Sequence, residues 1–159
     1  MKNISEHISY GEATKSNTAL RYGIDNVPND EELTSMHLVA ENVFEPLREF
    51  AGHPIRINSF FRSAALNKKV GGSKTSSHTK GQAMDIDSLG NLTNLEMAKF
   101  IIERLSFDQV IIEYPNLQGE PKWVHLSYVS EEKNRNQVLV CKRVGGRVVY
   151  SFWNNENLL

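Results

Sequence analysis

Apolar residues recur every three or four positions between Leu33 and Phe50, which is the spacing of one face of an α-helix. Asn29 or Asp30 can cap the start of this helix, and Gly52 is a typical end. Pro46 lies inside the pattern and lacks a backbone N–H. We therefore expect the helix to bend at Pro46 or to end its regular part early.

Two more helices are expected further along the chain. A short one covers residues 63–70, and a longer one opens with the capping-box pattern of residues 93–96. The apolar residues expected to form the buried face of the longer helix are Leu95, Ala98, Ile101, Ile102 and Leu105.

The remaining apolar segments alternate with polar residues or are rich in β-branched residues, as strands are. They are residues 54–60, 81–87, 109–114 and 122–129. Residues 138–144 and 147–153 flank a Gly-Gly pair and predict a C-terminal hairpin. Residues 71–80 are dominated by Gly, Ser, Thr and Lys and predict a surface loop.

Helices and strands are mixed without strict βαβ alternation, so the expected class is α+β with a central, mostly antiparallel sheet and flanking helices. We expect a polar lead-in over residues 1–28, followed by a single domain over residues 29–159. This domain includes the hairpin at 138–153, which is expected to form an edge of the sheet and close the core.

Composition narrows the class of protein. The 159 residues suit one globular domain, and a net charge of −1 lacks the basic excess of a nucleic-acid binder. No apolar run approaches the roughly 18 residues of a membrane span. Cys141 is the only cysteine, so no internal disulfide can form. The first 20 residues lack the apolar stretch of a secretory signal, which predicts synthesis in the cytoplasm without a cleavable signal.

Two histidines and one aspartate are the strongest candidates for chemistry. Asp85 and His125 lie on the polar faces of two expected strands, and His78 lies in the polar loop. If the strands face one cleft, two imidazoles and one carboxylate suit a zinc ion with a fourth position for water. The spacing alone also fits solvated loop residues and a half-buried strand histidine. The other histidines, His7, His37 and His53, have no partner at ligand spacing.

The sequence around these residues resembles that of a known family. Residues 76–85, SSHTKGQAMD, resemble the S-x-H-x-x-G-x-A-x-D signature of the zinc D-alanyl-D-alanine carboxypeptidases, the peptidase M15 family. Residues 57–63, INSFFRS, and 123–128, WVHLSY, are similar to two further family segments in the same order. The resemblance covers roughly residues 30–130 and is closest to the carboxypeptidase-like subgroup, which includes phage endolysins. It implies the fold shared by hedgehog domains and DD-peptidases.

The resemblance implies a role for each matching residue. His78, Asp85 and His125 would hold one zinc ion. Arg62 would polarise the scissile carbonyl or hold a substrate carboxylate; otherwise it is a surface arginine after a strand. Ser76 would line the substrate cleft, although a simple turn hydroxyl is an equal reading.

The general base is harder to place. Some relatives carry a glutamate three residues before the last histidine, where this chain has Lys122, and a histidine two residues before it, where this chain has Trp123. Glu113, a charged residue in an apolar strand, is the better candidate for the base unless it faces solvent. Glu120 is the fallback.

The resemblance thus implies a zinc metallopeptidase that hydrolyses peptide bonds in peptidoglycan stem peptides or cross-links. Its partners would be peptidoglycan peptides, without nucleic acid or a membrane span, and it would act as a monomer on the cell wall, reached through a phage holin or another route. The alternative is a zinc-binding module without catalysis, as in some hedgehog domains.

Overall fold

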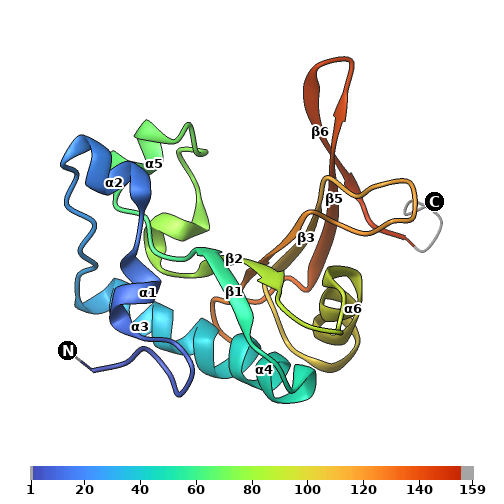
Figure 1. The fold of residues 1–159 in the computed structure, drawn as a ribbon, viewed down its shortest axis with the longest axis horizontal. Coiled ribbons are helices and arrows are strands. Elements are labelled where there is room, and N and C mark those ends of the chain that lie inside the picture. The colour runs from blue at the N-terminus through green and yellow to red at the C-terminus, as the bar shows by residue number, and fades with distance from the viewer. Residues whose placement is uncertain (1, 155–159) are drawn as a thin grey trace.

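A computed structural model describes residues 2–154 of the chain. Its centre is a six-stranded sheet in the order β1-β2-β4-β3-β5-β6 (Figure 1). The strands are β1 (Ile55–Ser59), β2 (Ala83–Ser88), β3 (Gln109–Glu113), β4 (Trp123–Ser127), β5 (Gln137–Val144) and β6 (Arg147–Phe152). Neighbouring strands are antiparallel except β3 and β5, which run parallel. The α+β class with a mostly antiparallel sheet is confirmed.

Helical segments surround the sheet. They are α1 (Tyr10–Thr14), α2 (Asn17–Tyr22), α3 (Asp30–Val39), η1 (Ala40–Phe44), α4 (Glu45–Ala51), α5 (Ala64–Lys69), η2 (Ser77–Lys80) and α6 (Asn94–Arg104). No helix among the described residues has the length and apolar character needed to cross a membrane.

The segments α3, η1 and α4 follow one another without a break and form the long helix expected from the apolar spacing. Asn29 caps it through a reciprocal pair of bonds with Glu32, and Gly52 ends it with a φ of 67°. The irregularity expected at Pro46 is a π-helical turn over η1, which widens the helix just before the residue that cannot donate a backbone bond.

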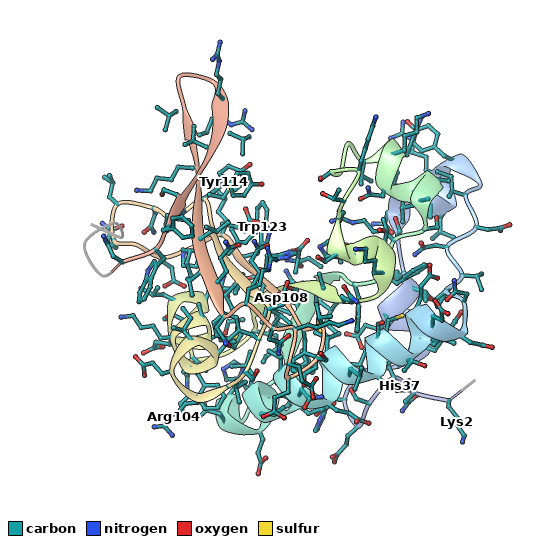
Figure 2. All side chains as sticks on the ribbon, turned by 180° about the vertical axis from the view of Figure 1, so that it is seen from behind. Lys2, His37, Arg104, Asp108, Tyr114 and Trp123 are labelled. Carbon is teal, nitrogen blue, oxygen red and sulfur yellow. The ribbon has the colours of Figure 1, made fainter. Side chains whose placement is uncertain are left out.

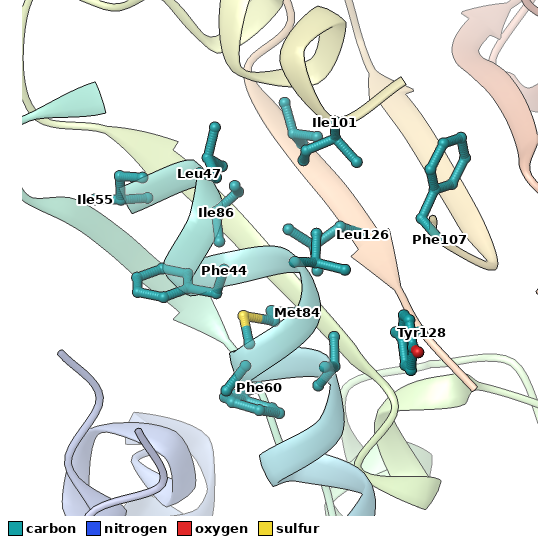
Figure 3. Packing of buried hydrophobic residues seen from close by; sticks show 14 of the residues in the cluster. Phe44, Leu47, Ile55, Phe60, Met84, Ile86, Ile101, Phe107, Leu126 and Tyr128 are labelled. Carbon is teal, nitrogen blue, oxygen red and sulfur yellow. The ribbon is translucent and has the colours of Figure 1, made fainter. Parts of the chain in front are cut away.

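One face of the sheet and two helices build the core. Phe44 and Leu47 of the long helix pack with Met84 and Ile86 of β2 and with Leu126 of β4 (Figure 3). On α6 the residues buried against this core are Asn94, Met97, Ala98 and Ile101. The expected face was therefore wrong in part, because Leu95, Ile102 and Leu105 are only half-buried and Met97 takes the central position.

The lead-in is part of this core. Ile4, Ile8 and Ala13 are buried in the same hydrophobic cluster as the long helix. Polar composition hides this, since only a few apolar side chains from residues 1–28 provide the contact. By contrast, most of the C-terminal hairpin lies outside this core.

The hairpin forms with its expected Gly-Gly turn, at φ values of 56° and 78° for Gly145 and Gly146. Its base, with Val138, Val140 and Trp153, packs on the core. Its residues from Lys142 to Phe152 are exposed, and Figure 1 shows β6 and the end of β5 projecting away from the body. The hairpin forms an edge of the sheet as expected, but only this base packs on the core.

Candidate metal centre

Three segments far apart in the sequence converge on one face of the sheet. Asp85 of β2 lies directly opposite His125 of β4 in the antiparallel register. His78 enters from η2, the short helical turn just before β2. The alternation of each strand places Asp85 and His125 on the same face, opposite the face that carries Met84, Ile86 and Leu126 into the core.

The three side chains lie at the separations that a shared metal ion requires. Nε2 of His78 is 3.3 Å from Oδ2 of Asp85, and Nδ1 of His125 is 3.0 Å from Oδ1 of Asp85. Their ligand atoms all lie within 4.8 Å of one another. Two ligands about 2.0–2.1 Å from a tetrahedral ion lie roughly 3.3 Å apart, so this group can hold a single metal ion and leave one position open.

His78 is buried and oriented by the protein. Its Nδ1 lies 2.7 Å from the carbonyl oxygen of Phe60, which leaves Nε2 pointing at Asp85. A second contact fastens the same turn, since the backbone N–H of Arg62 donates to the carbonyl of His78 at 3.2 Å. A ligand histidine held through its other ring nitrogen is the usual arrangement at metal sites.

The structure explains why the motif has a glycine, Gly81, three residues after His78. Its φ is 69°, and a Cβ at this position would lie 2.4 Å from the carbonyl oxygen of Glu32 on α3. Only glycine combines that conformation with such a close approach. The turn that carries His78 is therefore packed directly against the long helix.

The electrostatics of the group favour an ionised carboxylate. Burial by itself would raise the pKa of Asp85, but the charges and hydrogen bonds of His78 and His125 outweigh it and hold the pKa well below its usual range. A deprotonated carboxylate is the form that binds a cation.

Arg62 completes this side of the site. Its Nη2 donates to Oδ2 of Asp85 at 3.3 Å and its Nε donates to Oγ of Ser59 at 3.0 Å. The guanidinium therefore lies beside the candidate metal-binding group formed by His78, Asp85 and His125, and its contact with substrate stays a prediction.

The chain around Arg62 is held by a residue that the sequence did not single out. Nδ2 of Asn26 donates to the carbonyl oxygens of Thr14 and Phe61 at 2.8 and 3.0 Å, and its Oδ1 accepts from the N–H of Ser63 at 2.7 Å. Asn26 thus bonds to both neighbours of Arg62. A lone asparagine in a polar segment carries no pattern from which this contact could be read.

Comparison with known families adds to this geometry. The sequence profile described as Peptidase M15 matches residues 6–127. The chain belongs to the peptidase M15 family. No curated protein matches it. The matched region of this M15 domain starts within the lead-in, contains the three metal-binding candidates and Arg62, and ends before the hairpin.

Glu113 lies on the same face of the sheet as the candidate metal ligands Asp85 and His125. It is opposite Trp123 of β4 and Cys141 of β5, two residues beyond Ile111, which is opposite His125. Only 8% of Glu113 is exposed. Burial, together with the charge of Asp85, raises the pKa of Glu113 against the effect of His125 and a hydrogen bond with Cys141. A carboxyl group with this raised pKa suits a general base.

Glu120, the alternative candidate, is engaged elsewhere. Its carboxylate accepts the N–H of Asn94 at 2.7 Å and that of Leu95 at 3.4 Å, at the N-terminus of α6. This position stabilises the helix dipole. Asp87 is also turned to that helix, since its Oδ1 accepts from Nδ2 of Asn94 at 2.8 Å.

Ser76 caps the turn that carries His78. Its Oγ accepts the N–H of His78 at 3.3 Å, and its carbonyl accepts the hydroxyl of Thr79. These bonds fit the reading of Ser76 as a turn hydroxyl, and its contact with substrate stays a prediction.

Trp123 and Lys122 lie just before His125, and both contact Tyr114. The ring of Trp123 packs against Tyr114 with centroids 5.5 Å apart, and Nζ of Lys122 lies 6.0 Å from the Tyr114 centroid. Figure 2 shows Tyr114 and Trp123 below the hairpin, on the side of the sheet that faces α5. The aromatic pair therefore lies next to the candidate metal ligand His125, since Trp123 is two residues before it on the same face of β4.

Proposed function

We propose that this M15 domain is a zinc metallopeptidase that hydrolyses peptide bonds in peptidoglycan stem peptides or cross-links, as a D-Ala-D-Ala carboxypeptidase or an endolysin-like endopeptidase. The observation that carries the proposal is the meeting of His78, Asp85 and His125 beside Arg62, within the region that matches the family. Peptidoglycan as substrate follows from the family resemblance of the motifs.

In this proposal each residue of the site has a separate role in hydrolysis. A zinc ion held by His78, Asp85 and His125 would supply a Lewis acid and lower the pKa of a water molecule. Glu113 accepts the proton of the attacking water and returns it to the leaving amine. Arg62 donates hydrogen bonds to the carbonyl oxygen as negative charge develops there. The buried position of Glu113 excludes bulk water from the proton that it holds.

The proposed place of action is the bacterial cell wall. The enzyme would work there as a monomer after synthesis in the cytoplasm, and a phage holin is one route by which it would reach the wall.

Product analysis tests the reaction. Zinc-loaded protein is incubated with purified peptidoglycan, and the released peptides are identified by mass spectrometry. We expect new amino and carboxyl termini at one bond type, which also tells a carboxypeptidase from an endopeptidase. Zinc-loaded protein that releases no peptide from any wall preparation would leave the non-catalytic zinc-binding module as the function.

The general base is tested by a matched pair of variants. Glu113→Gln should lower kcat by about 100-fold or more, the usual contribution of a general base, with the zinc content unchanged. Because an ionised carboxylate with a raised pKa destabilises the fold at neutral pH, this variant should unfold at the same or a higher denaturant concentration than the wild type. Activity within about twofold of the wild type would remove Glu113 from the mechanism.

Glu120→Gln is the control. It should lower the free energy of unfolding by about 0.3–1 kcal/mol, because a charge leaves the N-terminus of α6, and it should leave kcat unchanged.

A further inference from the structure

The strand nearest to Arg62 has a free edge. β1 (Ile55–Ser59) is the outermost strand and pairs only with β2. Within residues 2–154, no backbone hydrogen bond joins β1 to any other element. Every second residue of such an edge strand points its N–H and C=O away from the sheet, where another extended chain can bond to them.

A groove runs beside this edge. It has a volume of about 600 Å³ and is lined by residues 56–59, 61 and 62 of β1 and the segment after it, by Glu12 and residues 15–18 of the N-terminal segment, and by Leu66 and Val70 in and after α5. The wall formed by the N-terminal segment is itself extended where α1 meets α2, since Lys15 has φ and ψ of −65° and 132° and Ser16 has −152° and 121°. Figure 1 shows α1 beside β1. The volume is that of a site for a ligand of small-peptide size.

The groove is built firmly at the end next to the metal-binding group. The N–H of Phe61 donates to the carbonyl of Ala13 at 3.1 Å, which joins the two walls. Asn26 joins them again through Thr14 and Phe61. Arg62 lines the groove and also donates to Asp85, so one residue contacts both the groove and the candidate metal ligands.

We propose that this groove binds the substrate peptide in an extended conformation, as an added strand along β1, and so delivers the scissile bond to the site beside Arg62. The inference rests on the proposed function and names the subsite that the function requires. At about 3.3 Å per residue, the five residues of β1 can pair with a segment of about four or five substrate residues. Backbone bonds to an edge strand hold a peptide by its main chain, with side-chain pockets adding selectivity.

The charged side chains that line the groove determine which peptides it favours. Lys15, Arg56 and Arg62 face the groove together with one carboxylate, that of Glu12. Arg56 lies 3.9 Å from Asp87 but keeps 58% of its side chain exposed, so this pair leaves its charge accessible to a ligand. The groove therefore favours a peptide that carries carboxylate groups.

The backbone contacts are tested with synthetic stem pentapeptides that are N-methylated at one position at a time. Binding is measured by calorimetry to the zinc-loaded Glu113→Gln variant, so that the peptide is not cleaved. Methylation at every second position should raise Kd by about 5- to 10-fold, the equivalent of one lost hydrogen bond. Methylation at the intervening positions should change Kd little. A uniform effect, or none, would overturn the added-strand arrangement.

The charges are tested in the same assay. Lys15→Gln and Arg56→Gln should each raise Kd by about three- to tenfold for the acidic peptide and leave Kd unchanged when its carboxyl groups are amidated. Lys99→Gln, on the exposed face of α6, is the matched control and should have no effect. Equal Kd values for all three variants would overturn the assignment of the groove.

The failure of this inference and that of the proposed function are distinguishable. Alternating N-methyl effects with no hydrolysis by the wild type would support the groove and contradict the peptidase. Hydrolysis with neither alternation nor charge dependence would contradict the groove and leave the peptidase intact.

Discussion

Asn26 shows how a single side chain outside the motifs can determine the geometry of a site. It bonds to Phe61 and Ser63, on either side of Arg62, and to Thr14 in the N-terminal segment. The main chain at Arg62 is therefore held by the N-terminal segment as well as by the bond from its own N–H to the carbonyl of His78. Asn26 acts through Arg62 and is a positioning residue.

The role of Asn26 predicts a coupled effect on catalysis. Asn26→Ala should lower kcat by about tenfold and the free energy of unfolding by about 1 kcal/mol, because three partly buried backbone groups lose their partners. Steady-state kinetics in the wild-type and Arg62→Ala backgrounds separate the two effects. If Asn26 acts through Arg62, the kcat effect should disappear in the Arg62→Ala background. An undiminished effect there would show a general loss of structure.

At the scale of elements, the metal-binding group joins two kinds of structure with different rigidity. Asp85 and His125 lie on paired interior strands of the sheet. His78 lies at the end of the loop over residues 71–80, whose first part is largely exposed and is fastened by the bond from Nδ2 of Asn67 to the carbonyl of Ser73 at 2.8 Å. Loss of a shared ion would therefore release the loop more than the strands.

Chelation should show this difference. Hydrogen exchange followed by mass spectrometry, with and without a chelator, should reveal faster exchange over residues 71–80 and little change in β2 and β4. The apolar faces of the helices and strands keep the rest of the domain folded. Equal protection of the loop in both states would contradict the prediction.

At the scale of the whole molecule, an ion pair between the buried Asp108 and the half-exposed Arg135 joins the sheet to the segment before β5. Asp108, just before β3, accepts from Nε and Nη2 of Arg135 at 2.9 and 2.8 Å and from the backbone N–H of Arg135 at 3.2 Å. These hydrogen bonds outweigh burial and hold the pKa of Asp108 below its usual range. The pair links two parts of the chain whose separation in the sequence is large.

Stability should depend on this pair in a pH-dependent way. Since the folded-state pKa is lowered, the stabilisation is present above the unfolded pKa of about 3.9 and is lost as the pH falls through the folded value. Asp108→Asn should therefore lower the free energy of unfolding by about 1–3 kcal/mol at pH 7, with the difference from wild type shrinking towards pH 3.

Urea unfolding at a series of pH values measures this difference. Asp25→Asn, at an exposed position, is the control and should run parallel to the wild type. A difference between Asp108→Asn and the wild type that stays constant from pH 7 to pH 3 would contradict the ionic origin of the stabilisation.

Local patterns in the sequence determined the elements and part of the site. The apolar spacing of the long helix and the alternation that predicted strands over residues 81–87 and 122–129 are properties of short segments. The helix formed as predicted, and the strands formed within two residues of the predicted bounds, at 83–88 and 123–127. The same alternation placed Asp85 and His125 on polar faces that the structure brings together. The reason is that burial of one face of a helix or strand depends on residues a few positions apart.

Only the tertiary structure decided the partners of each segment. It placed Ile4 and Ile8 in the core, brought Asn26 to both neighbours of Arg62, turned Glu120 to the N-terminus of α6 and left Glu113 buried on the face of the sheet that carries His125. It also left the edge of β1 open beside a groove. These features depend on contacts between residues distant along the chain, and no periodicity within a single segment carries that information.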